Sequence, residues 1–250
     1  MSNSQISSGL NIVFASSAFP SQRVSNRTGA DVEALPTTFF VDWFRERGRN
    51  FPWRNGTVSP FAFMVTEILL RQTGARSVAK LWESFVSKYP DPQSMVKARK
   101  RVLIRALKVL GFGNQRAAAL QDAAKHLIDH HDGLVPHDLD QLLKIPHIGN
   151  YAARAVLCFA FDKKIEIVDT NILRFFSRYF GLTVNPDIRR NPQVWEIAKR
   201  ALPRAKAKAA AHNYGLLDFT AEVCKALQPK CTTCPLNTSC NWGRRKLAML

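Results

Sequence analysis

Four cysteines near the end of the chain constrain its fold more than any other feature. They are Cys224, Cys231, Cys234 and Cys240, with the spacing C-x6-C-x2-C-x5-C. Thiolates gathered this closely are typical ligands of a soft metal centre, and four of them complete a [4Fe–4S] cluster. Zinc is the alternative, but zinc modules usually contain two close ligand pairs, and only Cys231 and Cys234 form one. We therefore expect an iron–sulfur cluster to hold the 224–240 loop.

The charge of the chain points to a polyanionic partner. Lys and Arg number 36 against 19 Asp and Glu, which gives a formal net charge of +17. Nucleic acid is the first candidate for such a chain, and an acidic membrane surface is the second. No apolar run is long enough to span a membrane, so we expect no membrane partner. No segment has the form of a signal peptide, which favours the cell interior over a disulfide-forming compartment.

Residues 1–30 differ in composition from the rest of the chain. They are rich in serine, contain Arg23 and Arg27, and precede the first acidic residue, Asp31. We expect a disordered tail, with an organelle transit peptide as the alternative. We expect a cytoplasmic or nucleoid location, with the nucleus or an organelle as the alternative if residues 1–30 are a transit peptide.

The remaining sequence predicts an all-α fold. Apolar residues recur at helical spacing and strand-like alternation is weak. Helices are expected over residues 37–47, 61–70, 77–88, 97–110, 114–130, 138–143, 151–161, 171–180, 192–201 and 213–227. No internal repeat interrupts this pattern.

The segment 142–153 resembles a helix-hairpin-helix element. A tight turn from Pro146 to Gly149 precedes a helix, whose free amide groups and dipole favour an anion at its N-terminus. Gly149 would let a phosphate approach the backbone closely. His147 is a departure, because related hairpins usually carry Gly there, although His tolerates positive φ better than most residues. An ordinary αα-hairpin without a ligand is the alternative.

Three groups of motifs occur in a characteristic order. They are Pro52–Trp53–Arg54 with the 66–73 segment TEILLRQT, then the hairpin followed by the 168–171 segment VDTN, then the four-cysteine loop. Over about residues 36–242 this set resembles the helix-hairpin-helix DNA glycosylases of the endonuclease III and MutY superfamily. The stretches 113–117, 177–181 and 213–219 are most similar to the Mig-type G/T mismatch thymine DNA glycosylases.

The resemblance implies roles for three side chains. Asp169 matches the catalytic aspartate of the superfamily, whose carboxylate would stabilise positive charge on the sugar and activate water; a helix N-cap is the alternative, and the two roles are compatible. Glu67 matches the glutamate that handles protons in MutY, and here it would orient water or bond the flipped pyrimidine. Tyr151 stands where bifunctional relatives have a Lys nucleophile, which implies a monofunctional enzyme with Tyr151 as a pocket wall.

The resemblance also implies a set of DNA contacts. The target base must leave the stack, and a mismatched base leaves at a lower cost. Loops that enter the duplex would contain Arg71 and Gln72 on one side and Phe112 and Asn114 on the other, while His147 and Gly149 would contact a phosphate. A solvated helix end is the alternative for Arg71 and Gln72.

These inferences combine into one prediction for the whole chain. We expect a helical domain over residues 59–161 that ends in the hairpin, and a second domain formed by 31–58 with 162–250. The base pocket would lie between them. The expected activity is monofunctional excision of thymine or uracil opposite guanine, by a monomer acting on double-stranded DNA that contains a mismatched base. Adenine excision is the first alternative, disfavoured because the chain ends at Leu250, shortly after Cys240; a non-catalytic DNA-binding iron–sulfur protein and a lyase are the others.

Overall fold

The computed structural model describes Leu35 and residues 38–55, 58–185, 187 and 191–248. The predicted tail, residues 1–30, lies outside these described residues. Within them every regular element is helical, which confirms the all-α prediction. The longer elements are α1 (Phe39–Arg47), α2 (Pro60–Leu70), α3 (Ala75–Lys88), α4 (Pro92–Lys97), α5 (Lys100–Leu107), α6 (Gly113–His131), α7 (Leu139–Lys144), α8 (Asn150–Phe159), α9 (Thr170–Phe180), α10 (Pro192–Ala201), α11 (Ala209–Glu222) and α12 (Asn241–Leu247). Short 3₁₀ turns are η2 (Pro52–Arg54), η3 (Lys108–Leu110), η5 (Lys206–Lys208) and η6 (Cys231–Thr233).

Several helices begin at side chains that cap free backbone amides. Ser59 accepts a hydrogen bond from Ala62 N (3.2 Å) and is followed by Pro60, which lacks the amide that a first helical turn leaves unpaired. Asp138 accepts from Gln141 N (3.1 Å) at the start of α7. These caps are local in sequence, so the starts of α2 and α7 lie within one residue of the prediction.

One predicted helix, 97–110, is wrong as a single element. Lys97 ends α4, Ala98 and Arg99 are extended with ψ of 130° and 123°, and α5 then gives way to η3. Gln121 on α6 donates a hydrogen bond to Ala98 O (2.9 Å) and so satisfies a carbonyl that the break leaves free. The break therefore depends on a partner from another helix, which periodicity within the segment does not reveal.

The last predicted helix, 213–227, is displaced in the structure. It begins earlier, at Ala209, and ends at Glu222, so that Cys224 lies in the loop that follows α11. Close packing against α1 holds this helix in place, since a Cβ at Gly215 would lie 1.9 Å from Phe40 O. Only glycine permits this approach of the two backbones.

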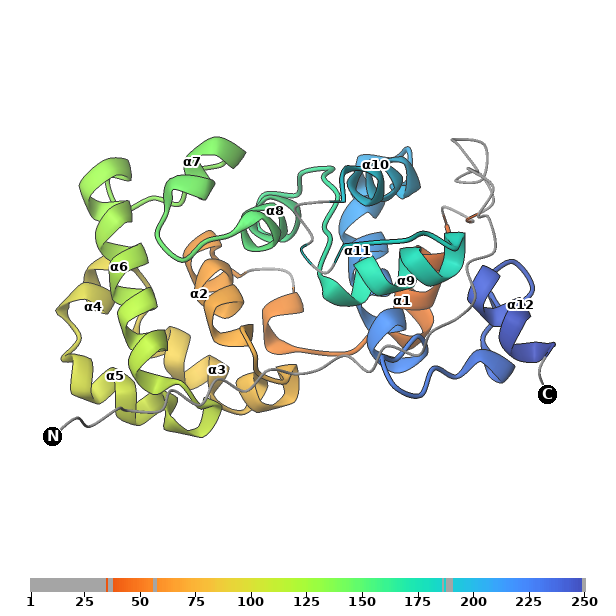
Figure 1. Ribbon diagram of the computed structural model, residues 1–250. Helices are drawn as coiled ribbons and strands as arrows, with labels where there is room; N and C mark the ends of the chain where they lie inside the picture. The colour runs from red at the N-terminus through yellow and green to blue at the C-terminus, as the bar shows by residue number, and fades with distance from the viewer. Residues whose placement is uncertain (1–34, 36–37, 56–57, 186, 188–190, 249–250) are drawn as a thin grey trace, which may run out of the picture.

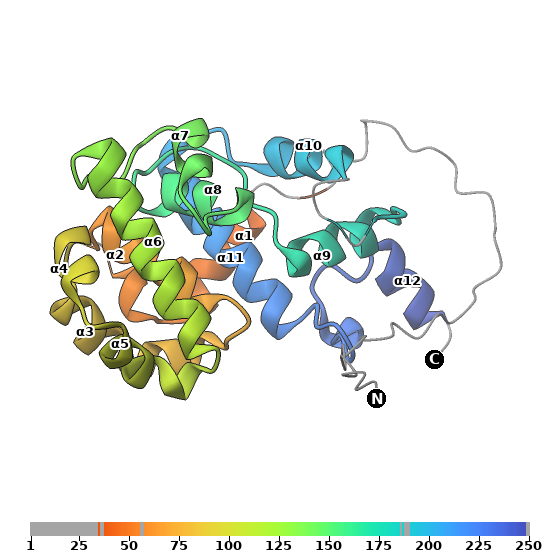
Figure 2. The same ribbon diagram turned by 60° about the vertical axis from the view of Figure 1, so that its left-hand side comes forward.

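The helices form two hydrophobic cores, with α6 and α12 at opposite ends of the molecule (Figures 1 and 2). The first core surrounds α2, in which every residue from Phe61 to Leu69 is buried. The second core includes Phe40 of α1 together with residues of α9, α10 and α11. The domain boundaries 59–161 and 31–58 with 162–250 stay a prediction. Phe51 and Trp53, which that prediction assigns to the second domain, pack in the first core.

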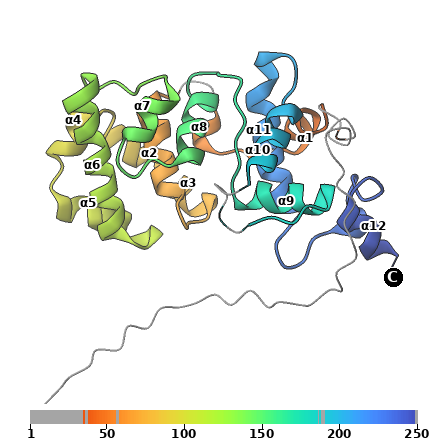
Figure 3. The same ribbon diagram turned by 45° about the horizontal axis from the view of Figure 1, so that its top comes forward.

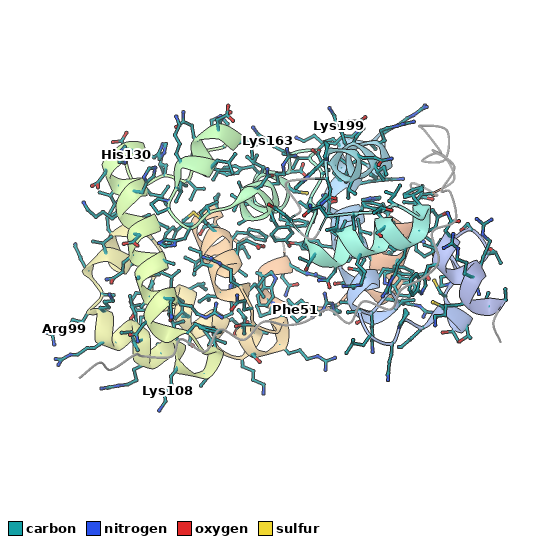
Figure 4. All side chains as sticks on the ribbon, in the orientation of Figure 1. Phe51, Arg99, Lys108, His130, Lys163 and Lys199 are labelled. Carbon is teal, nitrogen blue, oxygen red and sulfur yellow. The ribbon has the colours of Figure 1, made fainter. Side chains whose placement is uncertain are left out.

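Helix α8 lies between the two groups of helices, beside α2 on one side and α11 on the other (Figure 3). Phe51 also lies between the groups (Figure 4). Tyr151 and Phe159 of α8 pack against both cores. Tyr151 and Phe159 therefore connect the two cores at their junction. None of the described helices combines the length and the apolar composition that a membrane span requires.

Candidate active site

A cavity of about 710 Å³ opens at the junction of the two cores. Its walls come from α2, α8, α9, α11 and the η2 segment, so elements from both cores contribute. Six of the predicted site residues line it: Glu67, Arg71, His147, Gly149, Tyr151 and Asp169. Gln72, Phe112 and Asn114 do not line the cavity. The structure therefore brings the three proposed catalytic side chains together, and their roles stay predictions.

Asp169 is half-buried at the start of α9 and faces this cavity. Its Oδ1 accepts a hydrogen bond from Ile172 N (2.7 Å), which makes it the N-cap of α9. Its Oδ2 accepts from Asn171 Nδ2 (2.9 Å). Because each oxygen has a fixed donor, the carboxylate is held in one orientation while it remains open to the cavity.

Glu67 lies in the wall formed by α2 and is only 7% exposed. Burial raises the pKa of its carboxyl from 4.5 to about 8, with a further contribution from the negative charge of Asp169. The guanidinium of Arg54 acts in the opposite direction. At neutral pH Glu67 therefore mostly keeps its proton, whereas a carboxylate in water would have lost it.

Tyr151 occupies the first turn of α8, between the hairpin and the cavity. Burial, and then the charges of Glu67 and Asp169, raise the pKa of its hydroxyl well above the usual value. The phenol thus stays protonated at all physiological pH values and supplies a flat, partly apolar wall.

The sequence left open whether His147 can adopt a positive φ in the hairpin turn, and in the structure it does. His147 adopts φ +66°, the left-handed conformation, and its Nε2 lies 3.0 Å from Asp122 Oδ2 on α6. Gly149 is extended, and a Cβ there would meet nothing within 4 Å. Neither the backbone conformation nor the neighbouring atoms demand glycine at position 149, so the space in front of it is free for an external group.

The remaining predicted DNA contacts lie on two exposed loops beside the cavity. Gln72 follows α2 with φ +51°, and Phe112 precedes α6 with φ +52° and 57% exposure. Asn114 is exposed in the first turn of α6. The left-handed conformation is uncommon for residues other than glycine, and it occurs at the tips of both loops.

A buried ionic network behind the cavity was not predicted from the sequence. The Asp218 carboxylate, fully buried on α11, accepts hydrogen bonds from Arg54 Nη1 (2.8 Å) and Nη2 (3.0 Å) and from Arg49 Nε (2.7 Å). The Arg54 guanidinium lies 4.2 Å from the ring centre of Tyr214, which stacks on Phe159 at 3.8 Å. Arg54 and Asp218 both lie in stretches that carry the family resemblance. That resemblance was the only sequence signal for these two residues, and it did not indicate that they form a pair.

The four cysteines lie away from this cavity, between α11 and α12. They share one small cavity, with Phe175, Phe219 and Leu236 among its other walls. Gly243 N donates to Cys240 Sγ (3.3 Å), and Arg178 Nη1 lies 3.7 Å from Cys224 Sγ. Among the residues that the structure describes, no group of three or more His, Cys, Asp or Glu side chains is arranged to hold a metal ion.

Comparisons with known proteins agree with this fold. Residues 65–200 match the family model described as HhH-GPD superfamily base excision DNA repair protein. A thymine/uracil-DNA glycosylase of Methanothermobacter thermautotrophicus is 35% identical over 219 residues, covering 88% of this chain and 97% of that protein. An adenine DNA glycosylase of Mycobacterium tuberculosis is 32% identical over 208 residues, covering 83% of this chain and 67% of that protein.

The comparison of structures gives the same result. The solved structure of a thermostable thymine-DNA glycosylase superposes with a TM-score of 0.78 and 32% identity, covering 86% of this chain and 97% of that one. The resemblance inferred from the motifs is thus confirmed, and the chain belongs to the HhH-GPD superfamily of base excision DNA repair proteins.

Proposed function

We propose that this protein is a monofunctional DNA glycosylase of base excision repair that removes thymine or uracil mispaired with guanine. The observation that carries the proposal is the open cavity in which Asp169, Glu67 and Tyr151 meet. The similarity to thymine/uracil-DNA glycosylase over most of both chains supports the choice of bases. The charge of +17 suits a partner made of phosphates.

In this proposal the chemistry is hydrolysis of the bond between the sugar and the base. The base departs with the bonding electron pair, positive charge develops on the sugar, and water adds to the same carbon atom. Asp169 would stabilise that charge and take a proton from the water, in the orientation set by Asn171 and Ile172 N. The proton kept by Glu67 could be donated in a hydrogen bond to a pyrimidine carbonyl oxygen.

The wall of the cavity supports a monofunctional mechanism. A lyase needs an amine that attacks the sugar as a Schiff-base nucleophile. Tyr151 occupies the position where the resemblance places that amine, and the basic residues that line the described cavity, apart from His147, are Arg49, Arg54 and Arg71. A guanidinium remains protonated in proteins and does not form the imine.

We also propose that the four cysteines hold a [4Fe–4S] cluster. Their shared cavity and the N–H group directed at Cys240 suit thiolate ligation, since hydrogen bonds to sulfur are common around such clusters. Only Cys231 and Cys234 form the close ligand pair that zinc modules usually contain twice, which favours a cluster over zinc. The cluster would shape the loop between α11 and α12 beside the basic residues Arg244, Arg245 and Lys246.

Adenine excision is the second candidate function. The similarity to an adenine DNA glycosylase favours it, and a protonated Glu67 could serve a purine as well as a pyrimidine. Experiment can distinguish sharply between thymine or uracil and adenine as the target base.

We also propose that the protein acts as a monomer inside the cell, in the cytoplasm or nucleoid.

The test is to incubate the purified protein with duplexes that carry G·T, G·U, A·G or A·8-oxoguanine and to identify the released base by mass spectrometry. Thymine and uracil, each released from opposite guanine, are the expected products. Release of adenine would show that the protein is an adenine glycosylase, the second candidate. Binding to all four duplexes without release of any base would indicate a non-catalytic DNA-binding protein. Borohydride in a parallel reaction traps no covalent adduct if the enzyme is monofunctional.

A further inference from the structure

Arg116 connects the two exposed loops that flank the cavity. It lies in the first turns of α6 and is 4% exposed. Its Nε donates to Gly111 O (3.0 Å), in the 111–114 loop. Its Nη2 donates to Arg71 O (2.6 Å) and also bonds Thr73 Oγ1, both in the 71–73 loop. One planar guanidinium therefore fixes the distance between the backbones of the two loops.

The same guanidinium completes the C-terminus of α2. Its Nη1 donates to Ile68 O and Leu69 O, each at 2.9 Å. The last carbonyls of a helix lack partners within the helix and attract a cation. Helix α2 has no basic residue in its own last turn, so α6 supplies the charge through Arg116. The acceptors of the Arg116 guanidinium are backbone carbonyl oxygens and the Thr73 hydroxyl, and none of these acceptors is a carboxylate.

Thr73 adds a second connection between the loops. Its hydroxyl donates to Leu110 O (3.1 Å), at the end of η3, while it accepts from Arg116. Gln72 and Phe112, at the tips of the two loops, both adopt the left-handed conformation and are exposed. Such backbone conformations persist only where surrounding contacts determine them. Arg116 and Thr73 make such contacts to the backbones of both loops.

We propose that Arg116 is a positioning residue that makes the 71–73 and 111–114 loops one rigid unit, and that this unit is required to extrude the target base from the duplex. The inference rests on the proposed glycosylase function. Extruding a base from the stack costs a few kcal/mol of stacking and pairing energy. The side chains that enter the duplex must therefore keep their separation while the stack resists them. Two loops that moved independently would yield to that force.

The test measures extrusion without chemistry. In an Asp169→Asn background, 2-aminopurine placed beside the thymine of a G·T pair reports unstacking by its fluorescence. Arg116→Lys keeps the charge but loses the planar set of donors. We expect it to reduce the fluorescence increase at saturating protein by about tenfold, since small losses of alignment have large effects on such steps. Binding to a duplex with an abasic-site analogue, where no base must leave, should stay unchanged.

Two further variants keep the test decisive. Arg101→Lys makes the same chemical change at an exposed position of α5 and should leave the fluorescence increase intact. Thr73→Val removes one connection between the loops with little risk to folding, and it should give an intermediate loss of the fluorescence increase. It replaces Arg116→Lys as the test if that protein does not fold. A full fluorescence increase in a folded Arg116→Lys protein, or in Thr73→Val when that is the only folded variant, overturns the proposal. Absence of base release by the unmodified protein would instead overturn the proposed function, because the extrusion assay does not depend on excision.

Discussion

At the scale of single residues, the Asp169 carboxylate carries the proposed chemistry. Asn is as good an N-cap as Asp, so Asp169→Asn should retain the start of α9 and the melting temperature. It removes only the negative charge, and we expect single-turnover base release to fall by about a thousandfold or more. The measurement is quenched-flow excision from a G·T duplex, with duplex affinity as the control. Activity within tenfold of the parent would assign the charge stabilisation to another group.

Glu67 should make the stability of the protein depend on pH. Its folded pKa, about 8, lies above the ordinary value of 4.5, so between these values the folded state binds the proton more tightly than the unfolded state. The contribution of Glu67 is fully present below pH 4.5 and is lost as the pH rises toward 8, at roughly 1.4 kcal/mol per pH unit at most. Urea unfolding of Glu67→Gln and the parent at several pH values measures it. A pH-independent difference between the two proteins would refute the elevated pKa.

At the scale of elements, the hairpin before α8 should bind a phosphate through backbone amides. A Cβ at Gly149 meets no protein atom, so Gly149→Ala and Gly149→Leu should both fold normally. A longer side chain would occupy the space that a phosphate needs. We expect duplex affinity to fall with side-chain size, by about tenfold for Leu, the value of one strong charge-assisted contact. Fluorescence anisotropy with an undamaged duplex measures this, and equal affinities for all three proteins would place the phosphate elsewhere.

At the scale of the whole molecule, Asp218 joins the η2 segment, which packs in the first core, to α11 of the second core. Its carboxylate is fully buried and is held by Arg49 and Arg54. Asp218→Asn leaves two guanidinium groups without a counter-charge, and we expect a loss of about 3–5 kcal/mol in the free energy of unfolding. Calorimetry measures the loss. The exposed pair Lys125–Asp129, at a similar distance of 2.8 Å, provides the control, because Asp129→Asn should change the melting temperature little.

The amino-acid sequence by itself determined the features that depend on near neighbours. Helical periodicity and local caps such as Asp138 and Ser59 set most helices. The ordered motifs identified the family and the candidate residues Glu67, Tyr151 and Asp169. These signals are readable because each arises from side chains within a few positions of one another.

Only the tertiary structure decided which distant residues meet. The cavity joins α2, α8 and α9, and the Arg54–Asp218 pair spans 164 positions. The break at Ala98 and the connection made by Arg116 likewise depend on partners in other segments. A buried charge or a free carbonyl must find a partner wherever the folded chain brings one, and sequence spacing carries no record of that partner.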